Sequence, residues 1–344
     1  MISLLVINYR SSQLAVEAIR TARAASSEPL HVVVVDNSEN ASECDALRPH
    51  ADVVIAAPRN LGYAGGINLG RRSCTGDILL VSNPDVRFAP SAIDILAAQL
   101  RAGANVAGPA LYWDDAHTWI LPPADLHTAK EELDRALAAR SRAWARMSDK
   151  RRFLARVSFW NLAQPVEVRA VSGAVMAVRA SAFDEAEGFD ERFPLYFEET
   201  DFLRRVRGKI IYVPAARCRH LYNQSAGAAG DAASAKYAQS QEEYLRKWNG
   251  PAVASVLKSI RRRPAATTAQ PIDGPIDIDR DDVVVEASPL PDFATAAGRF
   301  ANRGTVELPD EVWSSYRGGT LYLRVADPRS GQVFATYARG RMPA

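Results

Sequence analysis

The most constraining feature of the sequence is the stretch Ile78–Val86, which reads ILLVSNPDV. A continuous apolar run of this length between turn residues is typical of a strand buried on both faces of a sheet. Proline cannot donate a hydrogen bond to a sheet ladder, so we expect the strand to end at Asn83-Pro84-Asp85. Asp85 would then lie at the carboxyl end of a central strand, where open α/β sheets place their ligands. Taken alone, the same residues also fit a turn with an exposed carboxylate.

The first hundred residues alternate apolar runs with helical patterns. Strands are expected at 3–7, 31–35, 53–56 and 78–81, and helices at 14–25 and 91–101. Fully apolar strands that alternate with helices predict an α/β fold with a mostly parallel sheet covered by helices on both faces.

The composition of the chain changes after residue 263. Residues 264–282 are rich in Pro, Ala, Thr, Asp and Gly without periodicity, which is typical of a linker. Beyond it, strands are expected at 283–286, 320–325 and 332–337, the last two joined as a hairpin. We therefore predict a main α/β domain over 1–263, a linker over 264–282, and a small β-rich domain over 283–344 whose residues indicate no chemistry.

Bulk composition excludes several classes of protein. A net charge of +2 does not favour nucleic-acid binding, and three scattered cysteines argue against a disulfide framework or zinc cluster and suit a reducing compartment. The apolar N-terminus is short and lacks a basic flank, so we interpret it as a strand and not a signal peptide. No window approaches the roughly 20 apolar residues of a membrane span. We expect a cytoplasmic protein, with contact at the inner face of the membrane as the sharper alternative.

A helical, basic segment is expected over residues 128–160. Between 130 and 156 it carries nine basic and four acidic residues, with aromatic residues among them. A solvated helix pair explains this pattern. So does a surface over 130–160 that binds anionic lipid or a lipid-linked acceptor.

Four glycines lie within the eleven residues 60–70. Their spacing fits neither a Walker loop nor a dinucleotide fingerprint. A flexible turn before a helix that begins near Gly66 is one interpretation. The other is a loop whose backbone approaches a nucleotide closely.

Three carboxylates, Glu198, Glu199 and Asp201, crowd the start of a helix expected over 198–207. Asp201 has arginines three and four residues later, so we expect it to be ion-paired and structural. Glu199 has apolar residues at the same offsets, which would raise its pKa and favour a general base. The helix N-terminus acts in the opposite direction, so the net shift stays open. A solvated acidic helix start is the alternative.

His220 follows a short strand expected at 210–213. A lone histidine is more often structural than a ligand. A carboxylate together with diphosphate oxygens would suit Mg²⁺, and one imidazole would tilt the site toward Mn²⁺. Whether His220 reaches Asp85 cannot be derived from spacing.

Taken in order, these motifs resemble inverting family-2 glycosyltransferases of the GT-A fold, with bacterial rhamnosyltransferase-like enzymes as the closest subgroup. The resemblance covers residues 1–250 and implies a nucleotide-diphosphate sugar donor (dTDP- or UDP-linked) and Mg²⁺ or Mn²⁺. It also implies transfer of a sugar such as rhamnose to a hydroxyl of a glycan or lipid-linked acceptor in bacterial cell-surface polysaccharide synthesis. The motifs are 36–38, 60–70, 83–85, 172–174, 189–191, 198–201 and His220.

The resemblance implies a role for individual residues. Glu199 would be the catalytic base, and Asp85 the last acid of an Asp-x-Asp motif. The implied donor contacts are Tyr9, Asp36, Asn60, Gly62, Gly66, Asn68, Asn83 and Asp85; the implied metal ligands are Asp85 and His220; Glu198, Asp201, Ser172 and Gly173 would contact the acceptor or support the site.

Two features depart from the family pattern. Asn83 replaces the first acid of the motif, so fewer carboxylates would neutralise a metal ion, and residues after 282 lie outside the resemblance. A metal beside the leaving diphosphate and one base on the opposite face suffice for direct displacement with inversion, whereas a glycosidase needs two carboxylates. One alternative is a nucleotidyltransferase, but the chain lacks a basic glycine loop near its first strand. The other is a nucleotide-sugar-binding or scaffolding protein without transferase activity.

Overall fold

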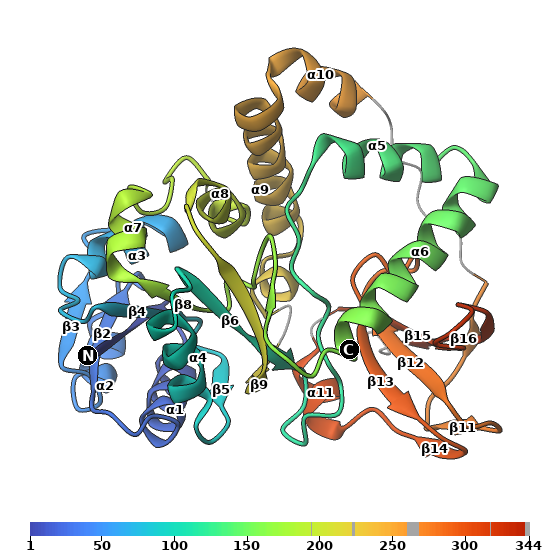
Figure 1. Ribbon diagram of the computed structural model, residues 1–344, viewed down its shortest axis with the longest axis horizontal. Helices are drawn as coiled ribbons and strands as arrows, with labels where there is room; N and C mark the ends of the chain where they lie inside the picture. Colours follow the sequence, from blue (N-terminus) through green and yellow to red (C-terminus); the bar gives the residue numbers. More distant parts are fainter. Residues whose placement is uncertain (194, 222–223, 260–267, 317, 341–344) are drawn as a thin grey trace.

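The computed structural model describes residues 1–193, 195–221, 224–259, 268–316 and 318–340. Within this part of the chain, a nine-stranded sheet has the order β3-β2-β1-β4-β8-β6-β9-β5, with β7 beside β9 (Figure 1). Its strands are β1 (Ile2–Asn8), β2 (Leu30–Asp36), β3 (Val53–Ala56), β4 (Ile78–Ser82), β5 (Val86–Phe88), β6 (Val106–Tyr112), β7 (Val166–Glu167), β8 (Val175–Arg179) and β9 (Ile210–His220).

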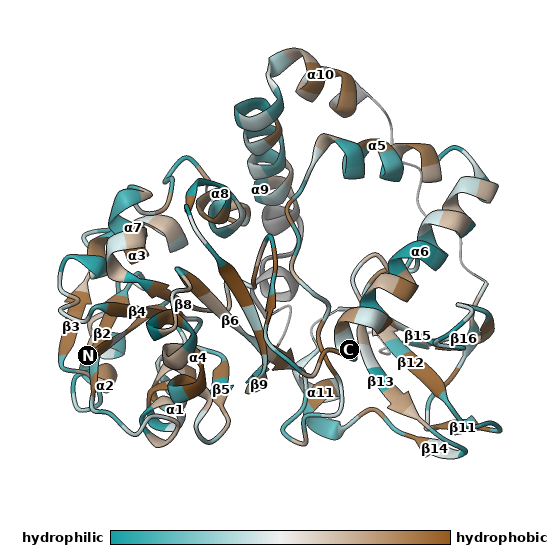
Figure 2. Cartoon of the chain, viewed as in Figure 1, coloured by the Kyte–Doolittle hydropathy of each residue, from teal (hydrophilic) through white to brown (hydrophobic). Residues whose placement is uncertain are grey.

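Strands β1 to β4 run parallel, and β1, β2 and β4 are buried over nearly their whole length. Alternate residues of β1 enter two different cores, because successive side chains of a strand point to opposite faces. Figure 2 shows hydrophobic residues along the strands of this sheet. The predicted α/β class, with a large sheet between helices, is confirmed.

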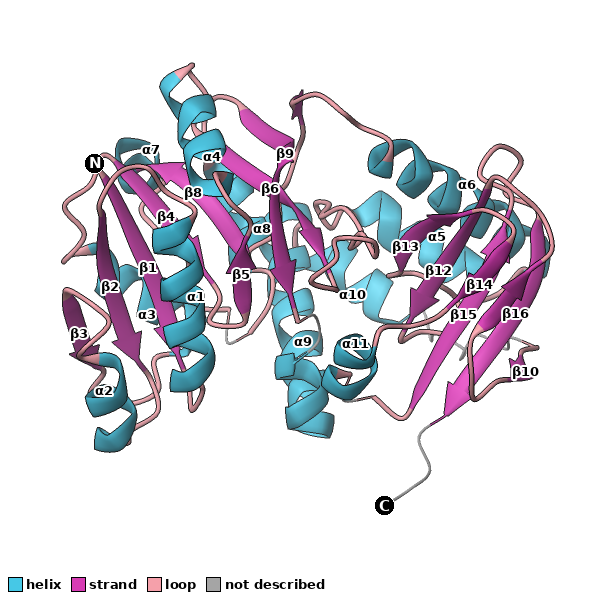
Figure 3. Ribbon diagram, turned by 90° about the horizontal axis from the view of Figure 1, so that it is seen from below, coloured by secondary structure: helices cyan, strands magenta, loops and turns pink. Residues whose placement is uncertain are grey.

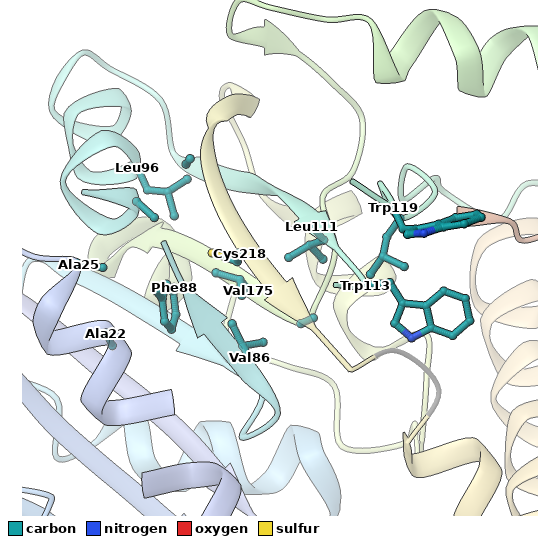
Figure 4. Packing of buried hydrophobic residues seen from close by; sticks show 14 of the residues in the cluster. Ala22, Ala25, Val86, Phe88, Leu96, Leu111, Trp113, Trp119, Val175 and Cys218 are labelled. Carbon is teal, nitrogen blue, oxygen red and sulfur yellow. The ribbon is translucent and has the colours of Figure 1, made fainter. Parts of the chain in front are cut away.

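Helices cover both faces of the sheet. Helix α1 (Ser12–Ala24) lies across β1 and β4 on one face, where α4 (Ala92–Arg101) shares its core (Figure 3). On the other face lie α3 (Gly62–Arg71), α7 (Ala180–Glu185) and α8 (Glu198–Arg205). Helix α2 (Ala41–Leu47) precedes β3. Figure 4 shows Val86 and Phe88 of β5 packed beside Val175 and Cys218, so β5 is anchored in the first core.

The glycine-rich run is a helix and not a loop. Helix α3 begins at Gly62, four residues before the expected start at Gly66. A Cβ at Gly66 would lie 3.0 Å from Cγ2 of Ile7, and one at Gly70 would lie 2.8 Å from Cγ2 of Val35. Helical glycines therefore let α3 approach the sheet closely, which accounts for their number without a ligand.

The chain after β9 is largely helical. Helix α9 (Gln224–Asn249) is followed by α10 (Pro251–Ser259). The basic segment forms the expected helices, α5 (Ala129–Ala138) and α6 (Arg142–Trp160). Within the described residues, no helix is both long and apolar enough to cross a membrane.

The C-terminal region contains a five-stranded sheet of order β10-β16-β15-β12-β13 and a small sheet of β11 and β14. The expected β15–β16 hairpin is confirmed. Strands β10 and β11 lie within the predicted linker 264–282, so that prediction is wrong for 270–271 and 276–278, whereas residues 264–267 lie outside the described residues. The division into two domains stays a prediction. The elements are β10 (Gln270–Pro271), β11 (Ile276–Ile278), β12 (Val283–Ser288), β13 (Ala297–Ala301), β14 (Gly304–Val306), α11 (Asp310–Ser315), β15 (Thr320–Ala326) and β16 (Val333–Gly340).

Helix α6 packs on the C-terminal sheet. Phe153, Val157 and Trp160 form one core with Val284 and Ala326. A second connection is a backbone pairing between residues 120 and 298, with N···O distances of 2.8 Å in both directions. One face of the basic segment is therefore buried against protein.

Candidate active site

Asp85 and His220 meet where two strands pair. Asp85 lies between β4 and β5, and Val86 of β5 pairs with His220, the last residue of β9. The two side chains are 11% and 14% exposed, and Nε2 of His220 lies 3.5 Å from Oδ1 of Asp85. The contact that spacing alone left open is therefore present.

The charge state of Asp85 depends on two opposing effects. Burial raises the pKa of Asp85, but the neighbouring His220 and hydrogen bonds from His220 and the backbone outweigh this, so the pKa falls below its ordinary value. Asp85 is consequently ionised at neutral pH. An ionised carboxylate is the form that binds a cation.

The Asp85–His220 pair fits part of a divalent-metal site. Ligands about 2.1 Å from one ion lie roughly 3 Å apart when they are neighbours, close to the observed separation of these two atoms. Among the residues that the structure describes, no group of three or more His, Cys, Asp or Glu side chains could hold a metal. An ion held here would need further ligands, and diphosphate oxygens have the required chemistry.

Glu198 and Glu199 begin α8 directly after an unusual turn. Tyr196 and Phe197 have φ of 66° and 70°, a region that bulky residues rarely adopt. Phe197 is buried and lies 5.3 Å from the ring of Tyr244. Aromatic packing thus holds the strained turn that directs the start of the helix.

The two glutamates share a buried environment. Burial, and then the charge of Glu199, raises the pKa of Glu198 well above its ordinary value. Oε2 of Glu198 has no hydrogen-bond partner among the residues that the structure describes. Burial also raises the pKa of Glu199, against the opposing effect of backbone hydrogen bonds. The net shift for Glu199, which the sequence left open, is therefore upward, as a general base near neutral pH requires.

Tyr63 lies among the acidic residues of the site. Burial and then the charges of Glu198, Glu199 and Asp85 raise the pKa of the Tyr63 phenol well above its ordinary value. All three carboxylates therefore lie within electrostatic range of one side chain. Sequence reasoning missed Tyr63, and its position inside the run 60–70 was the one available signal.

Asp201 has the structural role expected from its spacing. Its side chain is fully buried and pairs with Nε of Arg205 at 2.9 Å. Lys247 lies 2.7 Å away, and Nε1 of Trp248 donates a hydrogen bond to it at 2.9 Å. The predicted ion pair with Arg205 is confirmed, and the contacts with Lys247 and Trp248 tie α8 to α9.

Asp36, an implied donor contact, is buried in a polar network. Its Oδ1 accepts hydrogen bonds from Asn8 at 2.8 Å and from the hydroxyl of Ser38 at 2.6 Å, and its Oδ2 accepts one from Cys44. These bonds hold the carboxyl ends of β1 and β2 together. Tyr9, at the same edge, is 50% exposed. Donor contacts by Asp36 and Tyr9 stay predictions.

The other implied donor residues build α3 and its contacts. Oδ1 of Asn60 accepts a hydrogen bond from the backbone of Gly62 at 2.9 Å. The amide of Asn68 exchanges hydrogen bonds with the backbone of Phe189 and donates to Glu191. Gly66 faces the sheet, as described above. A donor role for these residues stays a prediction.

The last implied residues lie together. Asn83 donates its backbone N–H to the carbonyl oxygen of Ala174 at 2.9 Å. Oγ of Ser172 accepts from the backbone N–H of Ala174, and Gly173 packs against Glu199. The loop that carries Asp85 is thus joined through residues 172–174 to the glutamate.

Comparison with known proteins identifies the class. Residues 3–159 match the family model for glycosyl transferase family 2. This match spans slightly less than half of the chain and, with the relatives below, supports a glycosyltransferase. It is similar to N-acetylglucosaminyl-diphospho-decaprenol L-rhamnosyltransferase from two strains of Mycobacterium tuberculosis, with 28% identity over 235 residues, 59% of this chain and 70% of the relative.

Solved structures show only distant similarity. S. aureus TarS 1–349 in complex with UDP-GlcNAc superposes with a TM-score of 0.44 at 14% identity, over 63% of this chain and 57% of TarS. The mannosyltransferase PcManGT from Pyrobaculum calidifontis, in complex with GDP-Man and Mn²⁺, gives 0.43 at 14% identity, over 74% and 73%. The match spans little more than half of the TarS chain.

Proposed function

We propose that this glycosyltransferase moves a sugar from a nucleotide-diphosphate donor to a hydroxyl acceptor by direct displacement with inversion. Glu199 is the base, and Asp85 and His220 bind Mg²⁺ or Mn²⁺. One observation carries the proposal: Asp85, with its imidazole partner, and the half-buried Glu199 both lie within electrostatic range of Tyr63.

The chemistry follows from the two halves of the site. A bound divalent ion supplies neutralisation of the negative charge that develops on the departing diphosphate. Glu199 accepts the proton of the acceptor hydroxyl while the hydroxyl oxygen attacks the anomeric carbon. The bond between the anomeric carbon and the diphosphate breaks, and its electron pair leaves with the diphosphate. Because burial raises the pKa of Glu199, its ionised form is a stronger base than an exposed glutamate.

The identity of donor and acceptor rests on the relatives. The Mycobacterium tuberculosis proteins are named as L-rhamnosyltransferases acting on a diphospho-decaprenol-linked sugar. We propose a rhamnose-type donor linked to dTDP or UDP, and a lipid-linked glycan acceptor of cell-surface polysaccharide synthesis.

A lipid-linked acceptor suggests a membrane-facing surface, and α5 and α6 have the required character. Leu133, Leu137 and Met147 are 48%, 39% and 49% exposed. Five exposed basic side chains of the same two helices and the turn between them form no ion pair with any residue that the structure describes. They are Lys130, Arg140, Arg142, Arg146 and Lys150. We propose that this surface contacts anionic lipid.

Vesicle co-sedimentation tests the surface. The full chain should bind vesicles containing phosphatidylglycerol more strongly than neutral ones, and the difference should shrink as salt is added. The double variant Arg142→Glu/Arg146→Glu should lose this preference, whereas Arg303→Glu, an exposed residue of the C-terminal region, should keep it. Binding that ignores both lipid charge and salt contradicts the proposal.

The transfer itself is tested with a panel of nucleotide sugars, Mg²⁺ or Mn²⁺, and a lipid-linked acceptor analogue. Glu199→Gln should lower kcat by about 10²–10⁴-fold, the usual contribution of a general base. Asp85→Ala should lower kcat by at least as much, because the site loses a metal ligand. Glu185→Gln, an exposed carboxylate of α7, is the control. Undiminished activity in both site variants refutes the assignments. Donor binding without turnover on any acceptor would favour a sugar-binding protein.

A further inference from the structure

Residues 172–174, just before β8, touch both halves of the proposed site. On one side, the carbonyl oxygen of Ala174 accepts a hydrogen bond of 2.9 Å from the backbone N–H of Asn83. Asn83 lies two residues before Asp85. On the other side, a Cβ at Gly173 would lie 2.9 Å from Cγ and 3.0 Å from Cβ of Glu199. This segment therefore spans the distance from the metal loop to the base.

Tyr63 supplies a second anchor for the segment. Its hydroxyl donates a hydrogen bond of 3.0 Å to the carbonyl oxygen of Gly173, 110 residues away in the sequence. Its ring lies 6.3 Å from that of Phe189, which is buried in the second core. Helix α3 packs on β1 through its glycines and therefore holds the phenol of Tyr63 in a fixed place.

We propose that Tyr63 is a positioning residue for the base: by holding the carbonyl of Gly173, it fixes residues 172–174 and so sets the place of Glu199 relative to Asp85. The proposal rests on the function proposed above, because it needs Glu199 as the base. It assigns the one aromatic side chain of the glycine run a part in catalysis without contact to substrate.

Tyr63 does not act as a base itself. Burial and three neighbouring carboxylates keep its phenol protonated. The hydroxyl is therefore a permanent donor to Gly173. Without it, the carbonyl oxygen of Gly173 loses this donor, and the segment against Glu199 loses one of the two ties described above.

The test compares Tyr63→Phe with Tyr322→Phe, a control in β15, using the full chain. Because small misplacements of reacting groups cost up to 10²-fold, Tyr63→Phe should lower kcat by about 10- to 100-fold and leave KM for the donor within about twofold. In the Tyr63→Phe protein, the acid limb of the profile of kcat/KM against pH should move to lower pH. A loosened segment admits water to Glu199 and so weakens the burial that raises the pKa of Glu199. Among the residues that the structure describes, the titratable groups that interact with the charge of Glu199 are Glu198 and Tyr63.

The outcomes separate this inference from the proposed function. A Tyr63→Phe protein with the wild-type kcat and pH profile overturns the inference while an inactive Glu199→Gln protein upholds the base. A lower melting temperature with unchanged kinetics also overturns it, because that is a purely structural role. If Glu199→Gln stays active, the proposed function fails instead. The crystal structure of Tyr63→Phe then decides: displaced residues 172–174 support the anchor, and unmoved ones refute it.

Discussion

A buried ionic network joins α6 to the C-terminal sheet, and its central residue is the best target for perturbation. Glu286 is fully buried and receives Nε of Arg156 at 2.8 Å and Nε of Arg324 at 2.5 Å. Arg324 also reaches Asp149 at 2.7 Å. Both arginines are about 5% exposed or less, so their charges depend on these carboxylates and not on water.

The substitution Glu286→Gln removes one negative charge with little change in shape. Arg324 keeps Asp149, but Arg156 loses the carboxylate that it shares, and an amide N–H₂ would face a guanidinium. Breaking a buried pair by removing one partner costs about 3–5 kcal/mol, and we expect the lower part of this range because Asp149 remains. The exposed pair Arg329–Asp282, with side chains 83% and 72% exposed, provides the control: Asp282→Asn should cost under about 1 kcal/mol.

Urea unfolding gives the free energies, and hydrogen exchange locates the loss. Protection should fall in α6 and in β12 and β15 before it falls in β1 and β4, because the network holds the former elements together. A Glu286→Gln protein that unfolds within about 1 kcal/mol of the wild type, like the control, would refute the reasoning that these buried arginines need this charge.

Two further predictions concern the site. Gly173→Ala should lower kcat by roughly 10²-fold, because a Cβ would press on the side chain of Glu199. Gly319→Ala is the control, since a Cβ there meets nothing within 4 Å, and it should leave the kinetics unchanged. Equal kinetics in both variants would contradict the close contact. Glu198→Gln should become more stable relative to the wild type as pH rises. The pKa of Glu198 is raised in the folded state, so as pH rises this carboxyl ionises in the unfolded chain before it ionises in the folded one. The stability of the wild type therefore falls between the unfolded and folded pKa values of Glu198. A neutral glutamine avoids this loss. Urea midpoints at pH 4 and pH 8, with Glu185→Gln as control, measure this; a stability difference that does not change with pH would show that Glu198 is not buried in a raised-pKa state.

Much of the fold was predictable because its signals are local. The apolar runs of β1, β2 and β4 identify strands buried on both faces, and the hairpin of β15 and β16 follows from alternation around a turn. The ion pair of Asp201 with Arg205 was predictable because residues four apart share one face of a helix. The candidate base and the candidate metal ligand were named from motifs on such elements.

Only the tertiary structure decided how these groups are arranged. His220 meets Asp85 because β5 pairs with β9, a contact between residues 135 positions apart that no local period encodes. The pKa of Glu199 rises because distant residues bury it, while the helix N-terminus alone would lower it. The glycines of α3 suggested a loop because a sequence cannot distinguish glycine needed for freedom from glycine needed for close packing. Strand pairing, burial and packing each depend on the whole folded chain, whereas helical and strand periods depend on a few neighbours.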